Sequence, residues 1–346
     1  MSLLLRQAIL LAELPAAKGR ALLRELGPFR DEALERLKKH PSLSPSERKR
    51  LDFLDGAKLD QAIKLGVRWI ESDEYPPLFQ QWPDAPTGLF AWGNWDALNG
   101  PTIGIVGTRG ATTYGKAVAS KFAEAFARAG VTVVSGGAIG IDSAAHNGAL
   151  EGGGRTVAVL AGGVDRPYPA LNRGLFQRMR EAGGCMVSQF ACGTAPNDYK
   201  FLVRNCLIAA LSQAIVVVEA PERSGSISTA NRANELGRQV FVVPANIENL
   251  NFRGSHALIR DGATLVDHPD QVLLDLGLES VAQIQPAPPV NGTAAKIIAS
   301  LTTTPLAVEF ILERTGLPMS DVVGELTMLE LEGRIIHDAG GYAIKP

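Results

Sequence analysis

The stretch Gly104-Ile-Val-Gly107-Thr-Arg109-Gly110 is the most informative part of the sequence, because it leads from a buried strand directly into a glycine turn. Residues 102–106 predict a short β-strand, and residues 116–129 predict an amphipathic helix. A strand, a glycine turn and a helix in this order direct free backbone N–H groups and the positive end of the helix dipole to one place above a sheet. Phosphate groups are the usual occupants of such a place, so the sequence predicts a phosphate-binding turn.

Three kinds of phosphate ligand compete for this turn. The stretch at 110–117, GATTYGKA, nearly matches the P-loop motif, but Ala117 stands where a Ser or Thr must bind Mg²⁺. A dinucleotide site needs G-x-G-x-x-G and an acid after the second strand, whereas here the glycines fall at 104, 107 and 110 and that strand ends in Ser135. The third candidate is a polynucleotide backbone, with Arg109 as a rigid fork for a phosphate. A turn that needs glycine only for its own backbone remains the structural alternative.

The bulk composition describes an ordinary globular protein of 346 residues, 46% hydrophobic and 20% charged, with room for two or three domains. The net charge of −2 carries no overall signature of nucleic-acid binding, so any basic site must be local. Cys185, Cys192 and Cys206 lack C-x-x-C spacing, which argues against a zinc site or a disulfide framework. Residues 1–6 acquire a charge too early for a signal peptide, and no apolar run is long enough for a membrane span. We therefore expect a cytoplasmic protein without a membrane partner.

The sequence divides into four parts. Residues 1–72 predict a small domain of short helices, which either contacts nucleic-acid backbones or serves as a packing module. In residues 73–278 apolar β-branched runs alternate with helical stretches, which predicts an α/β domain whose parallel sheet is covered on both faces. Six strands are expected, at 102–106, 131–135, 156–160, 186–188, 215–219 and 240–243, and residues 88–92 could add an edge strand. Residues 279–292 are a proline-bearing linker, and residues 293–346 have the outline of a winged helix, with helices followed by a two-residue hairpin.

Three more segments are expected at the carboxyl ends of strands, where open α/β sheets bind their ligands. Ser135-Gly136-Gly137 begins a second glycine turn, which either binds an anion or simply turns tightly. The segment Ser224-Gly225-Ser226-Ile-Ser-Thr229 is a hydroxyl-rich loop that opens a helix and can hold phosphate. In residues 199–205, Lys200 and Arg204 flank Phe201, which could stack on a base or belong to the core.

A catalytic or metal-binding set is not evident in the sequence. Asp142 and His146 lie four residues apart on a predicted helix, but no third ligand stands at a useful spacing. A structural histidine is therefore favoured over a metal site. No convincing Ser-His-Asp or Cys-His arrangement and no pair of acids for general acid–base work is present. We expect neither catalytic residues nor a metal nor a cofactor.

Five segments, in one order and spacing, resemble the DNA-processing protein A family (DprA, also called Smf). They are GIVGTRGATTYG at 104–115, SGGAIGIDSAAHNGAL at 135–150, TVAVLAGGVDRPY at 156–168, FLVRNCLIAAL at 201–211 and SGSISTA at 224–230. Tyr75-Pro76, Pro86 and Gly93 resemble the lead-in of the family, and residues 254–263 resemble its closing motif. The resemblance covers about residues 70–275. The helical N-terminus, similar to a SAM or helix-hairpin-helix module, and the winged-helix tail also fit the three-part layout of the family.

The resemblance implies an extended Rossmann-like fold that binds single-stranded DNA without cleaving it. It also implies a homodimer that protects incoming DNA and hands it to the RecA recombinase during natural transformation. The DNA site would be lined by Gly107, Arg109, Ser135, Gly136, Gly137, Lys200, Phe201, Arg204, Asn205, Ser224, Gly225, Ser226 and Thr229. The dimer would form near an apolar stretch that could equally cap the sheet, with Leu258, Ile259, Leu265, Val272 and Leu273 as the interface residues.

The sequence departs from the pattern of the family at four positions. Cys206 stands where a second Arg is usual, which removes one candidate phosphate contact. Gln189, Ala245 and His256 replace a frequent Glu, Gly and Asn. None of these changes removes a whole motif.

Two other function classes compete with DNA binding through the core. The related Rossmann-type nucleotide N-glycosidases carry a P-G-G-x-G-T-x-x-E motif, and the loop at 224–230 has no matching Glu. A DNA-binding regulator could act through the winged helix. From residue 293 onward, however, seven acids stand against four bases, and the resulting charge near −3 is the wrong sign for holding phosphates. We expect this tail to contact a protein.

Overall fold

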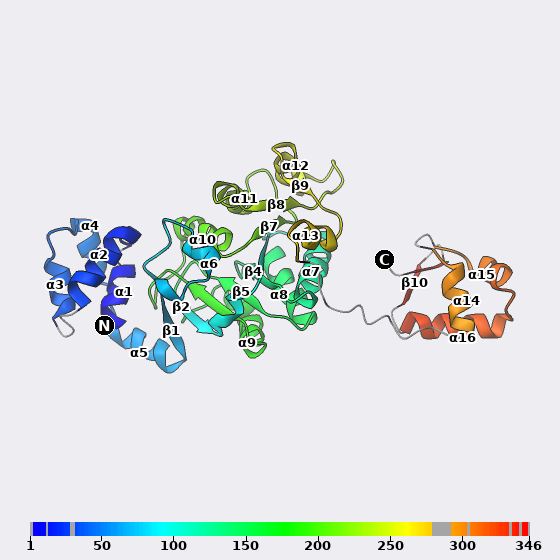
Figure 1. Cartoon of the computed structure of the whole chain (residues 1–346), viewed down its shortest axis with the longest axis horizontal. Coiled ribbons are helices and arrows are strands. Elements are labelled where there is room, and N and C mark those ends of the chain that lie inside the picture. Colours follow the sequence, from blue (N-terminus) through cyan, green and yellow to red (C-terminus); the bar gives the residue numbers. More distant parts are fainter. Residues whose placement is uncertain are drawn as a thin grey trace. The chain divides into compact units, whose positions relative to one another are not determined.

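The computed structural model describes residues 3–11, 13–27, 32–278, 292–302, 305–331, 334–338 and 341–344. These residues belong to two compact units, one within residues 1–281 and the other within residues 282–346 (Figure 1). Each unit has its own hydrophobic core.

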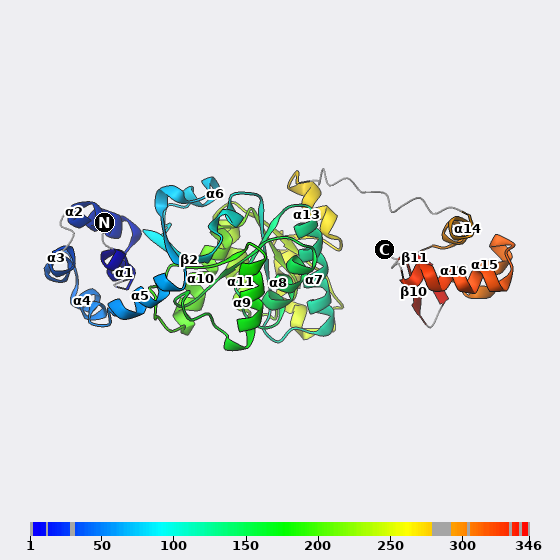
Figure 2. The ribbon, with the colours of Figure 1, turned by 90° about the horizontal axis from the view of Figure 1, so that it is seen from below.

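Five short helices begin the first unit (Figure 2), and the first and fifth of them pack against the first two strands. They are α1 (Leu3–Leu11), α2 (Ala16–Leu26), α3 (Ala33–Lys39), α4 (Pro45–Leu51) and α5 (Gly56–Lys64). Leucines spaced along these helices, including Leu22, Leu37 and Leu51, form a separate small core. The starts of α4 and α5 are set by side chains, because Ser44 and Asp55 accept the N–H groups of Glu47 and Lys58.

A nine-stranded sheet forms the centre of the first unit. Its strands are β1 (Val67–Glu71), β2 (Gly88–Gly93), β3 (Thr102–Val106), β4 (Thr132–Ser135), β5 (Thr156–Val159), β6 (Cys185–Ser188), β7 (Ala214–Val217), β8 (Gln239–Val242) and β9 (Thr264–Leu265). They pair in the order β1-β2-β6-β5-β4-β3-β7-β8-β9. The pairs from β6 to β9 are parallel, whereas β2 is antiparallel to both β1 and β6.

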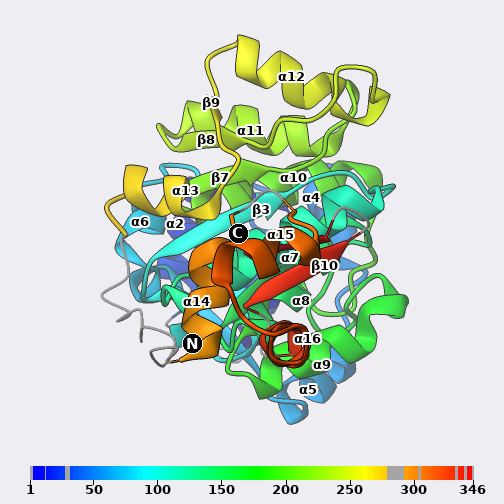
Figure 3. The same cartoon turned by 90° about the vertical axis from the view of Figure 1, so that its right-hand side faces the viewer.

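Helices cover both faces of this sheet, as Figure 3 shows. They are α6 (Pro77–Gln80), α7 (Thr113–Arg128), α8 (Ile141–Glu151), α9 (Arg173–Glu181), α10 (Asp198–Ala210), α11 (Gly225–Glu235), α12 (Arg253–Arg260) and α13 (Pro269–Asp275). Helices α7, α8 and α13 pack on one face through Phe122, Ile141 and Val272. Helices α10, α11 and α12 pack on the other face, and the strands between them are apolar on both sides, as a doubly covered parallel sheet requires.

The sheet confirms the predicted α/β fold class. All six predicted strands are present to within two residues at either end. Residues 88–92 do form a strand, but β2 lies between β1 and β6, so the edge on that side is β1. Strand β1 was not expected within residues 1–72, and those residues belong to the same compact unit as the sheet.

The strand order reverses between β3 and β7. From β3 the chain runs outward through β4, β5 and β6, then returns to place β7 on the other side of β3. In open α/β sheets the crevice above the carboxyl ends of such strands is where ligands bind. The segments that follow β3 and β7 therefore mark the place to look for a site.

The second unit is a winged helix, as predicted. Its helices are α14 (Thr293–Ser300), α15 (Val308–Thr315) and α16 (Met319–Leu331), and its hairpin is β10 (Ile335–Asp338) with β11 (Gly341–Ile344). A small core that includes Ile297, Ile311 and Leu326 holds it together.

Candidate nucleic-acid interface

The glycine turn after β3 is held tightly by its neighbours. A Cβ atom on Gly107 would lie 2.5 Å from Cγ1 of Ile141 and 2.9 Å from the carbonyl oxygen of Glu219. The N–H of Thr108 donates to that same carbonyl at 2.7 Å. Only glycine fits at position 107, and Arg109 and Gly110 are the exposed residues of the turn.

The start of helix α7 already holds an anion, and that anion is a side chain of the protein. The buried carboxylate of Glu219 accepts hydrogen bonds from the N–H of Thr112 at 3.0 Å, from its hydroxyl at 2.8 Å and from Nδ2 of Asn251 at 2.9 Å. A Cβ on Gly115 would lie 2.0 Å from Oε2 of Glu219, so this glycine makes room for the carboxylate. The helix start that the sequence assigned to a ligand phosphate is therefore filled from within, and the ligand must bind nearer to Arg109.

The turn after β4 is a packed structural turn. The hydroxyl of Ser135, which is completely buried, donates to the carbonyl of Ile105 at 2.6 Å. Gly137 has a positive φ of 69°, and a Cβ there would press on the ring of Phe176. In this structure Ser135 and Gly137 offer no group to a ligand in solvent, as the tight-turn alternative described.

Arg204 is a buried cation that ties two strand ends together. Its guanidinium donates to the carbonyls of Gly136 and Val159, the latter at 2.9 Å, and only 5% of the residue is exposed. A Cβ on Gly136 would overlap this guanidinium and would also approach the carboxylate of Asp142. Burial lowers the pKa of Arg204 and raises the pKa of Asp142, while each charge partly offsets the effect on the other. The sequence alone placed Arg204 on the surface beside Phe201, and its burial gives it a structural role.

Phe201 is half-buried, and it belongs to none of the core clusters of the described chain. The guanidinium of Arg109 lies over its ring, 4.4 Å from the centroid, and Arg204 lies 5.8 Å away. The ring of Tyr168, which is 53% exposed, has its centroid 6.4 Å from that of Phe201. An arginine and two aromatic rings thus meet at the surface above the sheet.

Lys200 does not share this cluster. Its Nζ donates to the carbonyl of Ala195 at 3.1 Å and lies near the ring of Phe190. It lines a different pocket, of about 580 Å³, which also includes Phe53 and Lys58 from the helical N-terminus. The two cations over the Phe201 ring are therefore Arg109 and Arg204, and a DNA contact of Lys200, which lies at the other pocket, stays a prediction.

The loop after β7 caps helix α11 with its own hydroxyl groups. Ser224 accepts the N–H of Ser226, and the two hydroxyls lie 2.7 Å apart. Nδ2 of Asn205 donates to the carbonyl of Gly225 at 3.1 Å, which links this loop to α10. Ser226 and Thr229 are buried, while Gly225 and Arg223 are exposed. The part of the loop that can meet a ligand is its exposed tip.

These segments enclose one open pocket of about 470 Å³. Its walls come from the turn after β3, from α10 and from the loop after β7, and they include Gly107, Arg109, Phe201, Arg204, Asn205, Arg223, Ser224, Gly225 and Ser226. A smaller pocket of about 130 Å³ adjoins it and shares Arg109 and Phe201. The expected residues Gly107, Arg109, Phe201, Arg204, Asn205 and Ser224–Ser226 are thus brought together.

Two residues of this region were not singled out from the sequence. Arg223 lies in the loop after β7, directly before Ser224, so its charge next to a hydroxyl-rich loop was an available signal. Tyr168 comes from the segment after β5, and its ring meets Phe201 only through the fold. Nothing in the local sequence indicated that pairing.

His146 is a buried structural histidine. The hydroxyl of Thr156 donates to the carbonyl of Val133, so Nδ1 of His146 must donate to that hydroxyl, at 2.7 Å. Burial, reinforced by the charge of Arg204, lowers the pKa of His146 to about 3. Within the described ranges, no three His, Cys, Asp or Glu side chains are grouped closely enough to hold a metal ion.

The residues expected at a dimer interface differ in exposure. Leu258, Val272 and Leu273 are buried within the chain, where they cap the sheet. Ile259 is partly buried, and Leu265 in the edge strand β9 is 50% exposed. Of the five residues, Leu265 presents the largest free apolar surface to a second copy.

None of the helices in the described parts of the chain is long and apolar enough to span a membrane.

Comparison with known proteins gives consistent matches. The family described as "DNA recombination-mediator protein A" matches residues 66–277, and that described as "DprA winged helix domain" matches residues 281–341. Protein Smf of Escherichia coli is 37% identical over 305 residues, which cover 82% of this chain and 80% of that protein. The crystal structure of DNA processing protein A from Streptococcus pneumoniae aligns with a TM-score of 0.62 and 31% identity, over 74% of this chain and 93% of that one. A structure of DNA processing protein A from Helicobacter pylori, reported for its single-stranded DNA binding mode, aligns with a TM-score of 0.56 and 28% identity, over 62% and 97% of the two chains.

Proposed function

The chain belongs to the DNA recombination-mediator protein A family, and from that premise we propose that it binds single-stranded DNA in the pocket above β3 and β7. The observation that carries this proposal is the contact of the Arg109 guanidinium with the ring of Phe201 at the mouth of the pocket. A base can stack on an exposed aromatic ring while a neighbouring guanidinium holds the adjacent phosphate. This pairing of groups suits a strand of nucleotides better than a free nucleotide in a closed site.

The preference for a single strand follows from the same geometry. The bases of a duplex stack on one another, so their faces are not available to Phe201, whereas an unpaired base can turn out of the strand onto the ring. The net charge of −2 also limits non-specific attraction for a duplex.

We propose that the protein acts on this DNA as a mediator and not as an enzyme. Two acids line the pocket: Asp142 lies buried beside Arg204, whereas Asp198 is exposed in the first turn of α10. A nucleotide N-glycosidase needs a carboxylate placed to act on the sugar, and the loop at 224–230 lacks the Glu of the glycosidase motif. The proposed steps are protection of incoming DNA and delivery of it to RecA in the cytoplasm, by a homodimer in natural transformation and recombination.

The test is a binding measurement with the full chain. Fluorescence anisotropy compares labelled oligo-dT with a duplex of equal length, and release of free base is followed in the same sample. We expect tighter binding of oligo-dT, an affinity that falls with salt, and no free base. Equal or better binding of the duplex would overturn the proposed site, and release of base in proportion to enzyme would establish the glycosidase instead.

A further inference from the structure

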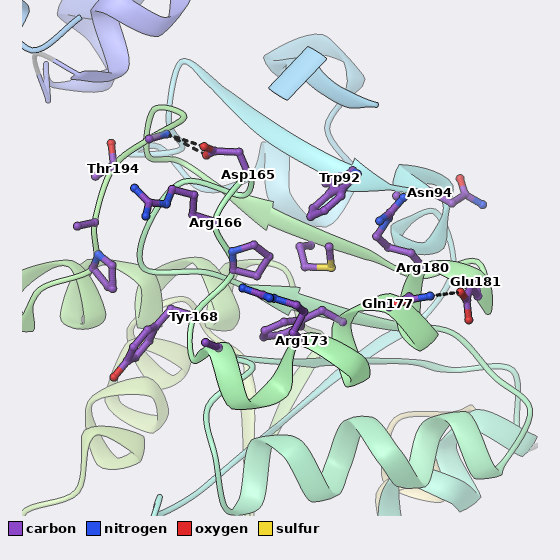
Figure 4. Close-up of a pocket in the computed structure, with 18 residues that line it drawn as sticks. Trp92, Asn94, Asp165, Arg166, Tyr168, Arg173, Gln177, Arg180, Glu181 and Thr194 are labelled. Carbon is purple, nitrogen blue, oxygen red and sulfur yellow. Dashed lines mark hydrogen bonds between the residues drawn. The ribbon is translucent and has the colours of Figure 1, made fainter. Parts of the chain in front are cut away.

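A second and larger cleft of about 1110 Å³ lies beyond Tyr168 (Figure 4). The segment 165–170 after β5, the helix α9, the end of β2 and the segment 193–196 form its walls. The side chains drawn in Figure 4 converge on its opening from these separate segments, with Arg166 and Arg173 on two sides of it. The proposed DNA site above β3 and β7 makes no use of this cleft.

The cleft contains arginines that the fold does not use. Arg166 and Arg173 are exposed, and their guanidinium groups have no hydrogen bond or ion pair within the described parts of the chain. The first turn of α9 begins at Arg173 and carries no acidic side chain. A third arginine, Arg180, lies over the ring of Trp92 at 4.1 Å, and its buried Nε lacks a partner. Free guanidinium groups beside an apolar floor are suited to phosphates that carry bases.

The cleft also contains two acids, and each accepts a hydrogen bond from the protein. The carboxylate of Asp165 accepts the N–H of Gly193 at 2.9 Å, and Glu181 accepts Nε2 of Gln177 at 2.8 Å. Both hydrogen bonds are drawn as dashed lines in Figure 4. Three arginines therefore stand against two carboxylates in this cleft, and Trp92 and Tyr168 add aromatic rings to its lining.

The cleft is continuous with the proposed DNA site. Arg166, Tyr168 and Pro196 line both the cleft and the small pocket of about 130 Å³. That small pocket shares Arg109 and Phe201 with the main pocket. The three cavities thus form one path, with the exposed ring of Tyr168 at the middle of it.

We propose that a DNA strand bound at Phe201 continues past Tyr168 into this cleft, where Arg166 and Arg173 bind its backbone phosphates. The ring of Tyr168 stacks on the base at the crossing. This inference rests on the proposed function and assigns the direction in which the bound strand extends. It predicts that short and long oligonucleotides use different sets of residues.

The experiment measures binding of two oligo-dT probes, of about 6 and about 20 nucleotides, over a range of salt concentrations. The variant is Arg166→Gln together with Arg173→Gln in the full chain. The matched control is Arg178→Gln, because Arg178 is exposed on the same helix but does not line the cleft, and its guanidinium donates to Oδ1 of Asn147. Since both replaced arginines lack partners, we expect the variant to melt at the temperature of the parent.

The short probe should bind the parent and the control equally, and it should lose less affinity in the variant than the long probe does, because only Arg166 also lines the small pocket beside Phe201. The long probe should bind the variant about tenfold more weakly than the parent. The slope of log affinity against log salt should fall by about 1.4, which is about 0.7 for each lost phosphate contact. Equal binding of the long probe by parent and variant, with equal slopes, would overturn the path. If the parent binds neither probe at low salt, the proposed function itself fails, and the path fails with it.

Discussion

At the scale of single residues, the two arginines beside Phe201 have opposite roles. Arg109 is exposed and its guanidinium lies over the Phe201 ring, whereas Arg204 is buried and donates hydrogen bonds to two carbonyls. We expect Arg109→Ala to weaken oligo-dT binding and to reduce the salt slope by about 0.7, with a stability change of no more than about 1 kcal/mol. Arg204→Ala should cost about 3–5 kcal/mol of stability, because it leaves Asp142 buried without its cation. Urea unfolding and salt-dependent anisotropy on both variants measure the two effects, and an Arg204→Ala protein as stable as the parent would contradict this assignment.

Phe201 provides the second test at this scale. Its ring is half-buried and lies outside the core clusters, so truncation should cost far less than the roughly 3–5 kcal/mol of a core phenylalanine. We expect Phe201→Ala to lose about 1–3 kcal/mol of oligo-dT binding while the salt slope stays that of the parent, since no phosphate contact is removed. Melting and binding are measured on one preparation. A large fall in Tm with near-normal binding would show that the ring acts by packing.

The sequence predicted which residues gather at the site better than it predicted what each one does. Arg109, Phe201 and Ser224 follow strands whose carboxyl ends must meet, so their proximity follows from the strand pattern. The burial of Arg204 depends on carbonyls 68 and 45 residues away, and the partner of Glu219 lies 107 residues away. Such contacts exist only in the folded chain, and no local pattern of residue types reveals them.

At the scale of secondary-structure elements, the stability of helix α7 should depend on the buried carboxylate of Glu219 at its start. A Cβ on Gly115 would lie 2.0 Å from Oε2 of Glu219, and that carboxylate is fixed by Thr112 and Asn251. Gly115→Ala should therefore destabilise the protein by about 1–3 kcal/mol, as overpacking does. Gly174→Ala is the control, because a Cβ near the start of α9 meets nothing within 4 Å and should stabilise by about 0.5–1 kcal/mol. Equal unfolding midpoints for the two variants would show that Glu219 is free to move.

Helix α8 should make the fold sensitive to acid through His146. The folded pKa is about 3, below the unfolded value of about 6.5, so the unfolded chain binds a proton more readily between those two pH values. Stability should then be lost progressively as the pH falls from about 6.5 toward 3, with a slope of up to about 1.4 kcal/mol per pH unit. The raised pKa of Asp142 acts in the opposite sense, so the parent is compared with His146→Leu. In urea unfolding, the free energy of unfolding of the variant should fall less steeply with decreasing pH than that of the parent. Equal pH dependence in the two proteins would show that His146 is not the cause.

The strands show why some elements can be predicted and others cannot. Strands β3 to β7 are fully buried runs of mainly apolar residues, and β8 is buried except at Gln239, a pattern that marks these strands in the sequence. Strand β1 reads Val-Arg-Trp-Ile-Glu directly after a helix and carries an exposed arginine, and β9 has two residues, both exposed. These edge strands are defined by pairing with β2 and β8 and not by their own composition.

At the scale of the whole molecule, the open edge of the sheet at β9 is where we expect two copies to associate. Thr264 and Leu265 are exposed there, and Leu274 nearby in the sequence is 60% exposed. An edge strand with free backbone groups and an exposed leucine favours pairing with a second copy about a two-fold axis. Val272 and Leu273 are buried in the core, so substitutions at these two positions would test folding and not association.

The prediction for this edge is that Leu265→Lys yields a monomer, because charge on an edge strand opposes pairing with another chain. The control is Leu171→Lys, which adds the same charge at a leucine that is 83% exposed on a different segment. Sedimentation at micromolar concentration should find a dimer for the parent and the control, and a monomer for Leu265→Lys with an unchanged Tm. A dimer that survives Leu265→Lys would place the interface elsewhere, and a monomeric parent that binds oligo-dT normally would show that one copy suffices. The pocket around Phe201 is formed by residues of a single chain, so we expect the monomeric variant to keep the parent's affinity for the short oligo-dT. Longer oligo-dT should bind the monomer more weakly than the dimer, because a long strand can occupy the pockets of both copies in a dimer.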